Sequence, residues 1–264
     1  ESEFVVLCGK SGCGKSTLLR HLKKSMNPYG DKLGSVCFDG EEIEEMSDKD
    51  AASKIGYVQQ NPDNQLVTDK VWHELAFSLE SLGYSNSVIK RRVAEMASYF
   101  GIQTWFRKSV SELSGGQKQL LNLASVMAMQ PEVLILDEPA SQLDPIAARD
   151  FLSTVHRLNR ELGVTIIISE HRLEEIFPLA DRAIVMDAGR IIANAKPSEV
   201  AIQLAGSGED DVHPMYYGMP PVMKLFPKEL VRWQDSLPMT LREGRILMEK
   251  LFENGTLTLK EAGV

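Results

Sequence analysis

Residues 9–17 read Gly-Lys-Ser-Gly-Cys-Gly-Lys-Ser-Thr, and this stretch decides the fold. It fits the phosphate-binding loop (P-loop) pattern, in which a glycine and four further residues precede Gly14-Lys15-Ser16. The apolar run at 4–7 predicts a strand before the loop, and residues 18–24 predict a helix after it. A strand, a glycine-rich turn and a helix follow one another in this order in phosphate-binding loops.

Each part of the loop has a chemical reason to hold phosphate. The glycines let the backbone fold tightly, so that successive N–H groups point at phosphate oxygens. The positive end of the following helix adds to this attraction. We expect Lys15 to reach the β- and γ-phosphates and the Ser16 hydroxyl to hold Mg²⁺. The residues expected to contact the nucleotide here are Gly9, Lys10, Ser11, Gly12, Cys13, Gly14, Lys15, Ser16 and Thr17.

Composition narrows the possible partners. The chain has 264 residues, with 29 Lys and Arg against 37 Asp and Glu, which gives a net charge of −8. This charge argues against general binding to nucleic acid or to an anionic membrane surface, and we expect no nucleic-acid partner. No apolar run approaches the roughly 18 residues of a membrane-spanning helix. The cysteines Cys8, Cys13 and Cys37 lack the spacing of metal ligands, and the histidines are scattered.

Apolar segments that end in polar residues predict the rest of the core. Residues 133–136 form a continuous apolar run, typical of a strand buried in a parallel sheet, and they end in Asp137-Glu138. A second such strand at 164–169 ends at Glu170-His171. Further strands are expected at 34–39, 54–59 and 183–186, with a hairpin partner at 190–193. The alternation with helices predicts an α/β fold with a central, mostly parallel sheet, whose sites lie at the carboxyl ends of the strands.

Helical spacing dominates the middle of the chain. Val71, Leu75 and Leu79 fall on one helix face, and a second helix is expected to end near residue 101. We therefore expect a helical subdomain at about 63–129 within a nucleotide-binding domain at 1–206. The glycine- and acid-rich stretch at 206–211 reads as a linker, and a capping box at 240–243 opens a helix that reaches 251. Residues 207–264 are thus predicted to be a linker and a C-terminal helical extension.

A second motif, Leu113-Ser114-Gly115-Gly116-Gln117, decides the class of P-loop protein. Together with the P-loop, Gln60, Asp137-Glu138, Asp144 and His171, in that order, it resembles the ATP-binding cassette (ABC) family over residues 4 to about 200. The resemblance implies a P-loop ATPase that uses ATP and Mg²⁺. A small-molecule kinase, another P-loop class, is excluded mainly by this signature motif.

The resemblance and the side-chain chemistry together assign roles. Asp137 suits the shell of a magnesium ion, together with Ser16 and Gln60. Glu138 is expected to be the general base that polarises the attacking water; the alternative is that it only tunes the local field. His171 can donate to the γ-phosphate, and Gln60 can orient the water. The expected catalytic residues are Glu138, His171, Gln60 and Lys15.

The signature motif also implies a partner. Ser114, Gly115, Gly116 and Gln117 begin a helix and so form a second anion site. In the ABC family two cassettes pair head to tail, and each signature covers the ATP bound by the other. We therefore expect a second ABC domain as partner, with Asp144 at the seam between the two.

Residues 57–66, Tyr-Val-Gln-Gln-Asn-Pro-Asp-Asn-Gln-Leu, resemble a narrower group, the energy-coupling factor importers for vitamins and transition-metal ions. This implies an ATPase subunit, or half of a fused tandem ATPase, at the cytoplasmic face of the membrane. We expect a groove near Gln60 to Leu66 to receive a helix of the membrane subunit; helix capping is the alternative role for Asn64 and Gln65. The competing function is a soluble ABC ATPase of ribosomes or chromosomes. The acidic composition and the lack of room for a long coiled coil between P-loop and signature disfavour it.

The first predicted strand lies at the very start of the sequence, so we expect an amino-terminally truncated cassette. In the ABC family an aromatic residue that stacks on adenine lies upstream of the P-loop. Phe4 is too close to the loop for that role and is expected in the core. We also expect residues 34–39 to pair abnormally or to be mobile.

Overall fold

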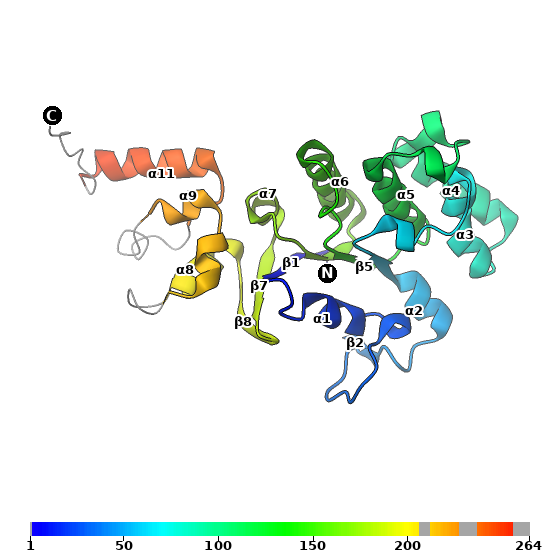
Figure 1. Ribbon diagram of the computed structural model, residues 1–264, viewed down its shortest axis with the longest axis horizontal. Helices are drawn as coiled ribbons and strands as arrows, with labels where there is room; N and C mark the ends of the chain where they lie inside the picture. The colour runs from blue at the N-terminus through cyan, green and yellow to red at the C-terminus, as the bar shows by residue number, and fades with distance from the viewer. Residues whose placement is uncertain (1, 206–211, 227–236, 256–264) are drawn as a thin grey trace.

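A six-stranded sheet forms the centre of the computed structural model, which describes residues 2–205, 212–226 and 237–255 (Figure 1). The first five strands in spatial order run parallel, and the last is the antiparallel hairpin partner of its neighbour. Their order is β4 (Ile55–Val58), β5 (Val133–Asp137), β6 (Thr165–Ser169), β1 (Phe4–Gly9), β7 (Arg182–Asp187) and β8 (Arg190–Ala195). The predicted α/β fold with a mostly parallel sheet is confirmed.

The period-two alternation of the strands divides the core between the two faces of the sheet. On one face, Val6 and Leu134 belong to the larger apolar cluster, which Figure 1 shows covered by α6 and α7. On the other face, Leu7 and Ile135 pack with Leu19 of the helix that follows the P-loop. The helices next to the sheet are α1 (Lys15–His21), α2 (Asp48–Lys54), α6 (Pro145–Leu162), α7 (Leu173–Ile176) and the turn η5 (Phe177–Leu179).

Three helices pack against one another beside β4, the outermost strand on that side of the sheet (Figure 1). They are α3 (Val71–Ser81), α4 (Asn86–Tyr99) and α5 (Gly115–Met127); the turn η2 (Pro62–Asn64) precedes α3, and η3 (Ile102–Trp105) and η4 (Val110–Glu112) lie between α4 and α5. The helices predicted from the apolar spacing are therefore present. None of the described helices is long and apolar enough to cross a bilayer.

The chain beyond β8 continues in further helices, α8 (Pro197–Ala205), η6 (Pro214–Gly218), α9 (Pro221–Lys224) and α11 (Leu241–Glu253). Of these, η6 packs on α8 and α11 packs on α9. Thr240 caps α11 by accepting from the Glu243 N–H, as predicted, but the Glu243 carboxylate accepts from the Met239 N–H instead of completing the capping box at Thr240. The linker predicted at 206–211 lies outside the described residues.

Two segments are shorter than predicted. The strand expected at 34–39 is reduced to β2 (Cys37–Phe38), which pairs only with β3 (Glu41–Glu42) in a separate two-stranded sheet. Gly34 and Asp39 both have positive φ values, +94° and +50°, and these turns bound the extended backbone on either side. Helix α1 ends at His21, and the 3₁₀ turn η1 (Lys24–Met26) follows it.

Gly56 on β4 allows α5 to approach the sheet closely. A Cβ atom at Gly56 would lie 2.6 Å from Cγ1 of Val126 and 3.1 Å from Cδ1 of Leu134. Gly56→Ala should therefore lower the free energy of unfolding by about 1–3 kcal/mol, measured by chemical denaturation. Gly218→Ala, whose Cβ meets nothing within 4 Å, is the control and should stay within about 0.5 kcal/mol of the parent.

A double variant tests the cause of that loss. Because Val126→Ala removes the atom nearest to the new Cβ, Gly56→Ala combined with Val126→Ala should lose less stability than the two single losses added together. Strict additivity would mean that Val126 does not cause the clash.

Candidate functional site

The loop between β1 and α1 encloses the Lys15 side chain, which is 3% exposed. Its Nζ donates to the carbonyl oxygens of Gly9 at 3.0 Å and Lys10 at 3.3 Å. A Cβ at Gly9 would lie 2.3 Å from the Met186 carbonyl oxygen, so only glycine fits where the loop crosses β7. Gly14, with a left-handed backbone, is the N-cap of α1, and the loop therefore passes directly into the helix.

The cysteine of the loop is part of the core. Cys13 is buried and packs with Leu19 and Met186, and its carbonyl oxygen accepts from the Gly189 N–H at 3.0 Å. Of the predicted loop contacts, Cys13 can thus meet a nucleotide through its backbone only. Burial raises the pKa of the neighbouring Cys8 thiol to about 12, which keeps it protonated.

The carboxylate of Asp137 accepts three hydrogen bonds from hydroxyl groups. Ser16 Oγ and Ser169 Oγ each donate to Oδ1 at 2.9 Å, and the Tyr57 hydroxyl donates to Oδ2 at 3.2 Å. Burial, and then the charge of Asp137, raise the pKa of Tyr57, so its phenol stays protonated and remains a donor. The four side chains come from α1, β4, β5 and β6, and they meet at the carboxyl edge of the sheet.

Glu138 brings together the residues that the sequence predicted to be catalytic. Its Oε1 lies 2.8 Å from His171 Nε2 and 3.5 Å from Lys15 Nζ, and Gln60 Nε2 donates to Oε2 at 3.2 Å. The Glu138 side chain is 17% exposed, so it is held in place yet reachable from solvent. A carboxylate in this position can accept a proton from water, with a cation and two donors beside it.

The oxygen atoms around Asp137 fit a magnesium ion. Mg²⁺ prefers oxygen ligands, and the Ser16 hydroxyl and the Asp137 carboxylate already meet at 2.9 Å. Ser16 and Asp137 are therefore the residues that would hold the ion. Gln60, which the sequence also assigned to the metal, donates its amide to Glu138 in this structure.

The signature motif lies at the start of α5. Ser114 Oγ accepts from the Gln117 N–H at 3.3 Å, and the Gln117 side-chain oxygen accepts from the Ser114 N–H at 3.0 Å, which forms a reciprocal capping box. Figure 1 shows α5 beside α3 and α4, well apart from α1. The structure therefore does not bring the signature, including Gly115 and Gly116, to the P-loop of the same chain.

Asp144 is the N-cap of α6, and Pro145 follows it at the first helical position. Its Oδ1 accepts from the N–H groups of Ile146 and Ala147, both at 3.0 Å. The carboxylate is exposed, so its place at a seam with a second domain stays a prediction.

The segment from Gln60 to Leu66 has two different surroundings. Asp63 pairs with Lys118 Nζ of α5 at 2.7 Å. Gln65 is held inside the chain: its Oε1 accepts from the Gln59 N–H and from Asn122, and its Nε2 donates to the Tyr57 carbonyl. The capping alternative holds for Gln65 only: it is the C-cap of η2, where its N–H donates to the Pro62 carbonyl oxygen, while the Asn61 side chain caps the other end of the turn.

A groove of about 330 Å³ lies beside this segment. Lys23 lines the groove on the side of the sheet, and Phe77 of helix α3 lines it on the opposite side. Gln65 and Val67 also line it. Phe77 is 37% exposed and Val67 is 66% exposed. Of the segment predicted to line a groove, Gln60 to Leu66, only Gln65 lines this one, and Asp63 lies outside it; its exposed apolar side chains are Val67 and Phe77.

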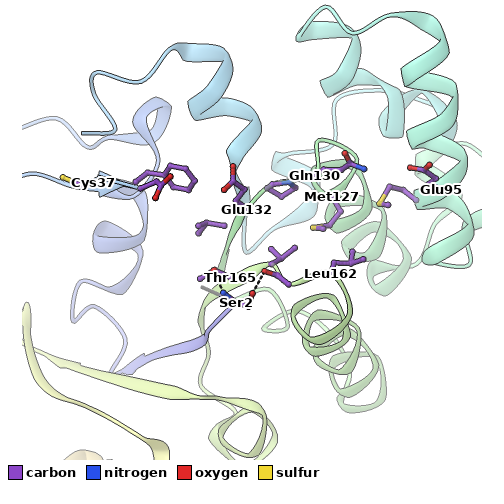
Figure 2. A pocket seen from close by; sticks show the side chains of 15 residues that line it. Ser2, Cys37, Glu95, Met127, Gln130, Glu132, Leu162 and Thr165 are labelled. Atoms are coloured by element: carbon purple, nitrogen blue, oxygen red, sulfur yellow. Dashed lines mark hydrogen bonds between the residues drawn. The ribbon is translucent and has the colours of Figure 1, made fainter. Parts of the chain in front are cut away.

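A cavity larger than this groove lies at the opposite, amino end of the parallel strands. It measures about 860 Å³, and Figure 2 shows Glu132 and Thr165, at the amino ends of β5 and β6, in its wall. The N–H of Ser2 donates to Thr165 Oγ1 there at 3.1 Å. None of the predicted site residues lines this cavity.

Sequence reasoning missed Tyr57 and Ser169 as partners of Asp137. Both lie in apolar strands and read as ordinary strand residues. One signal was available for Ser169, since it is a polar residue at the carboxyl end of a buried strand, as Asp137 is.

The carboxyl group of Glu170 is 1% exposed. Its Oε1 accepts from the N–H groups of His171 and Arg172, whereas Oε2 has no partner among the described residues. Burial raises the pKa of Glu170 above its ordinary value of 4.5. The stability that this group contributes is therefore fully present below about pH 4.5 and is lost as the pH rises through the raised pKa.

Replacing Glu170 by an uncharged side chain should show this pH dependence. Glu170→Gln should have a higher free energy of unfolding than the parent at pH 8, by about 1 kcal/mol, because no buried charge forms. This advantage should shrink as the pH is lowered towards 4.5, measured by urea denaturation at several pH values. The exposed Glu174→Gln is the control for loss of one negative charge, and an advantage of Glu170→Gln that is constant with pH would contradict the assignment.

The sequence is similar to a known protein family and to several curated proteins. The sequence matches the family described as "ABC transporter" over residues 1–141. A Bacillus cereus protein named "Putative ABC transporter ATP-binding protein" is 47% identical over 249 residues, which cover 94% of this chain and 43% of that protein. A Streptomyces avermitilis protein of the same name is 38% identical and is matched over 42% of its length. The chain thus spans less than half the length of these curated relatives.

Two solved structures are similar. CbiO1 from Clostridium perfringens, described as part of the ABC transporter complex CbiONQ, has a TM-score of 0.69 and 30% identity; the match covers 94% of this chain and 88% of that one. A dimeric ATP-binding cassette in a post-hydrolysis state, bound to ADP and phosphate, has a TM-score of 0.63 and 24% identity, over 74% and 86% of the two chains. The second likeness shows the fold alone.

Proposed function

The chain belongs to the ABC transporter family, and we propose that it binds and hydrolyses ATP to power an importer of the energy-coupling factor type, as a subunit or as half of a fused tandem ATPase. The observation that carries the hydrolytic part is the convergence of Lys15, Gln60 and His171 on Glu138, next to Asp137. The importer type is supported by the motif at 57–66 and by 30% identity with CbiO1. Its proposed cargo is a vitamin or a transition-metal ion.

The residues of this site divide the chemistry between them. Lys15 binds the phosphate oxygens, and Glu138 accepts a proton from the attacking water. When bound, Mg²⁺ held by Ser16 and Asp137 neutralises charge on the phosphates. His171 donates to Glu138 in the structure through Nε2, and the same N–H can donate to a γ-phosphate oxygen. The Gln60 amide donates a hydrogen bond to Glu138 and so limits the positions that the attacking water can take.

We also propose two protein partners. A second ABC domain supplies its signature motif head to tail, because α5 of this chain packs with α3 and α4 and lies apart from α1 (Figure 1). A cytoplasmic helix of a membrane subunit occupies the groove beside Phe77 and Val67, whose exposed apolar side chains suit an apolar helix face. This arrangement makes the chain a peripheral protein at the cytoplasmic face of the membrane.

Glu138→Gln in the full-length protein tests the hydrolytic role. The amide has the same size but cannot take a proton, so ATP hydrolysis should fall by about 10²–10⁴-fold while ATP binding persists. Phosphate release and equilibrium ATP binding measure the two effects. Glu132→Gln, exposed at the opposite edge of the sheet, is the matched control. Near-normal turnover in Glu138→Gln would assign the base elsewhere.

Phe77→Asp in the reconstituted transporter tests the groove. The charge should weaken docking of the membrane subunit, so transport should fall at least about tenfold while the ATPase domain alone hydrolyses ATP as before. Ile202→Asp on α8 is the control, since Ile202 is 38% exposed and Phe77 is 37% exposed. Equal transport in the two variants would contradict the groove assignment. Substitutions at Asp63 or Gln65 are less informative, because they break contacts inside the chain.

A further inference from the structure

We infer that Ser169 is a positioning residue for both carboxylates of the site: one hydrogen bond orients Asp137, and a second sets the backbone of Glu138. The Ser169 hydroxyl donates to Asp137 Oδ1 at 2.9 Å and accepts from the Glu138 N–H at 2.9 Å. The inference rests on the proposed hydrolysis of ATP, and it adds a residue that is fully buried.

The register of the sheet makes this double contact possible. Strands β5 and β6 run parallel with Asp137 directly opposite Ser169, so that both side chains lie on the same face. A hydroxyl group can donate one hydrogen bond and accept two. Ser169 can therefore donate to Asp137 and accept from the Glu138 N–H at the same time. Ser169 is 0% exposed, and water cannot take over either bond.

Glu138 needs such support because of its backbone. Its φ is +46°, in the left-handed region that non-glycine residues rarely adopt. Glu138 follows β5 directly in this backbone conformation, and from there its side chain contacts Lys15 and His171. The Glu138 N–H is shared between the hydroxyl and the carbonyl oxygen of Ser169, at 2.9 Å and 3.2 Å. Without the hydroxyl, one of these two restraints on the turn is lost.

Tyr57 separates the two roles, because its hydroxyl contacts only one of the two carboxylates, that of Asp137. Its hydroxyl donates to Oδ2 at 3.2 Å and is also approached by Arg20. Among the described residues it makes no hydrogen bond to Glu138. Removing the Tyr57 hydroxyl should therefore disturb the magnesium side of the site and leave the base in place, whereas removing the Ser169 hydroxyl should disturb both.

The test compares variants of the full-length protein. Ser169→Ala removes both bonds, Ser169→Thr retains the hydroxyl, and Tyr57→Phe removes only the Asp137 contact. Thr165→Val is the control: it removes a hydroxyl from the same strand at the opposite edge of the sheet, where Thr165 accepts from the Ser2 N–H. Calorimetric titration of ADP at a series of Mg²⁺ concentrations reports the metal side, and steady-state ATP hydrolysis reports kcat and KM.

We expect Ser169→Ala and Tyr57→Phe each to raise the Mg²⁺ concentration for half-maximal ADP binding about tenfold, the effect of one hydrogen bond to a charged group. At saturating Mg²⁺, kcat should fall about 10- to 100-fold in Ser169→Ala only, with KM unchanged. Ser169→Thr should restore both quantities, and Thr165→Val should resemble the parent.

Two results would overturn the inference. If Ser169→Ala matches Thr165→Val in Mg²⁺ dependence and kcat and only its melting temperature falls, Ser169 is merely structural. If Ser169→Ala and Tyr57→Phe lose kcat equally, Ser169 does not act on Glu138. Should Ser169→Ala fail to fold, Ser169→Cys decides, because its thiol is a weak hydrogen-bonding group: an unchanged kcat refutes the inference, and a reduced kcat supports it.

Failure of the proposed function would look different. If the unmodified protein bound ADP with Mg²⁺ but hydrolysed no ATP, the hydrolytic proposal would be wrong. The Mg²⁺ dependence of ADP binding in the same variants would still decide whether Ser169 and Tyr57 orient Asp137.

Discussion

The hydrogen bonds to the Asp137 carboxylate join the parts of the molecule on which the site depends. Ser16 from α1, Tyr57 from β4 and Ser169 from β6 all donate to it. They can do so only in the observed register, in which β5 pairs in parallel with β4 on one side and β6 on the other. A shift of one residue would turn these side chains to the other face of the sheet. The strand register that packs the sheet is therefore the same register that assembles the site at the carboxyl ends of the strands.

Features that depend on neighbours along the chain could be predicted from the sequence. The P-loop pattern predicted the strand, glycine-rich turn and helix that surround Lys15, and the apolar run at 133–136 predicted a buried strand ending at Asp137. The carboxyl-end rule for parallel sheets then brought Glu138 and His171 to the same edge, where the structure has them 2.8 Å apart. The Asp144 cap of α6 followed from an acceptor side chain placed before proline.

Features set by contacts between distant segments could not be predicted. Nothing local distinguishes Tyr57 from an ordinary strand tyrosine, because its role depends on the register of β4 against β5. The contacts that side chains make from a short 3₁₀ turn are equally hard to predict from the sequence. We predicted that the segment from Gln60 to Leu66 would line an open groove, yet Asp63 turns to Lys118 and Gln65 is held by Asn122.

The most direct test of the central claim, that this edge of the sheet holds a nucleotide with its metal, is a crystal structure with Mn²⁺ and a non-hydrolysable ATP analogue. The anomalous scattering of manganese locates the metal without reference to the surrounding atoms. Our account predicts a single strong peak beside Ser16 Oγ and the Asp137 carboxylate, with the phosphates against the loop that encloses Lys15. A metal bound elsewhere, or a nucleotide in the cavity that Thr165 lines at the opposite edge, would contradict it.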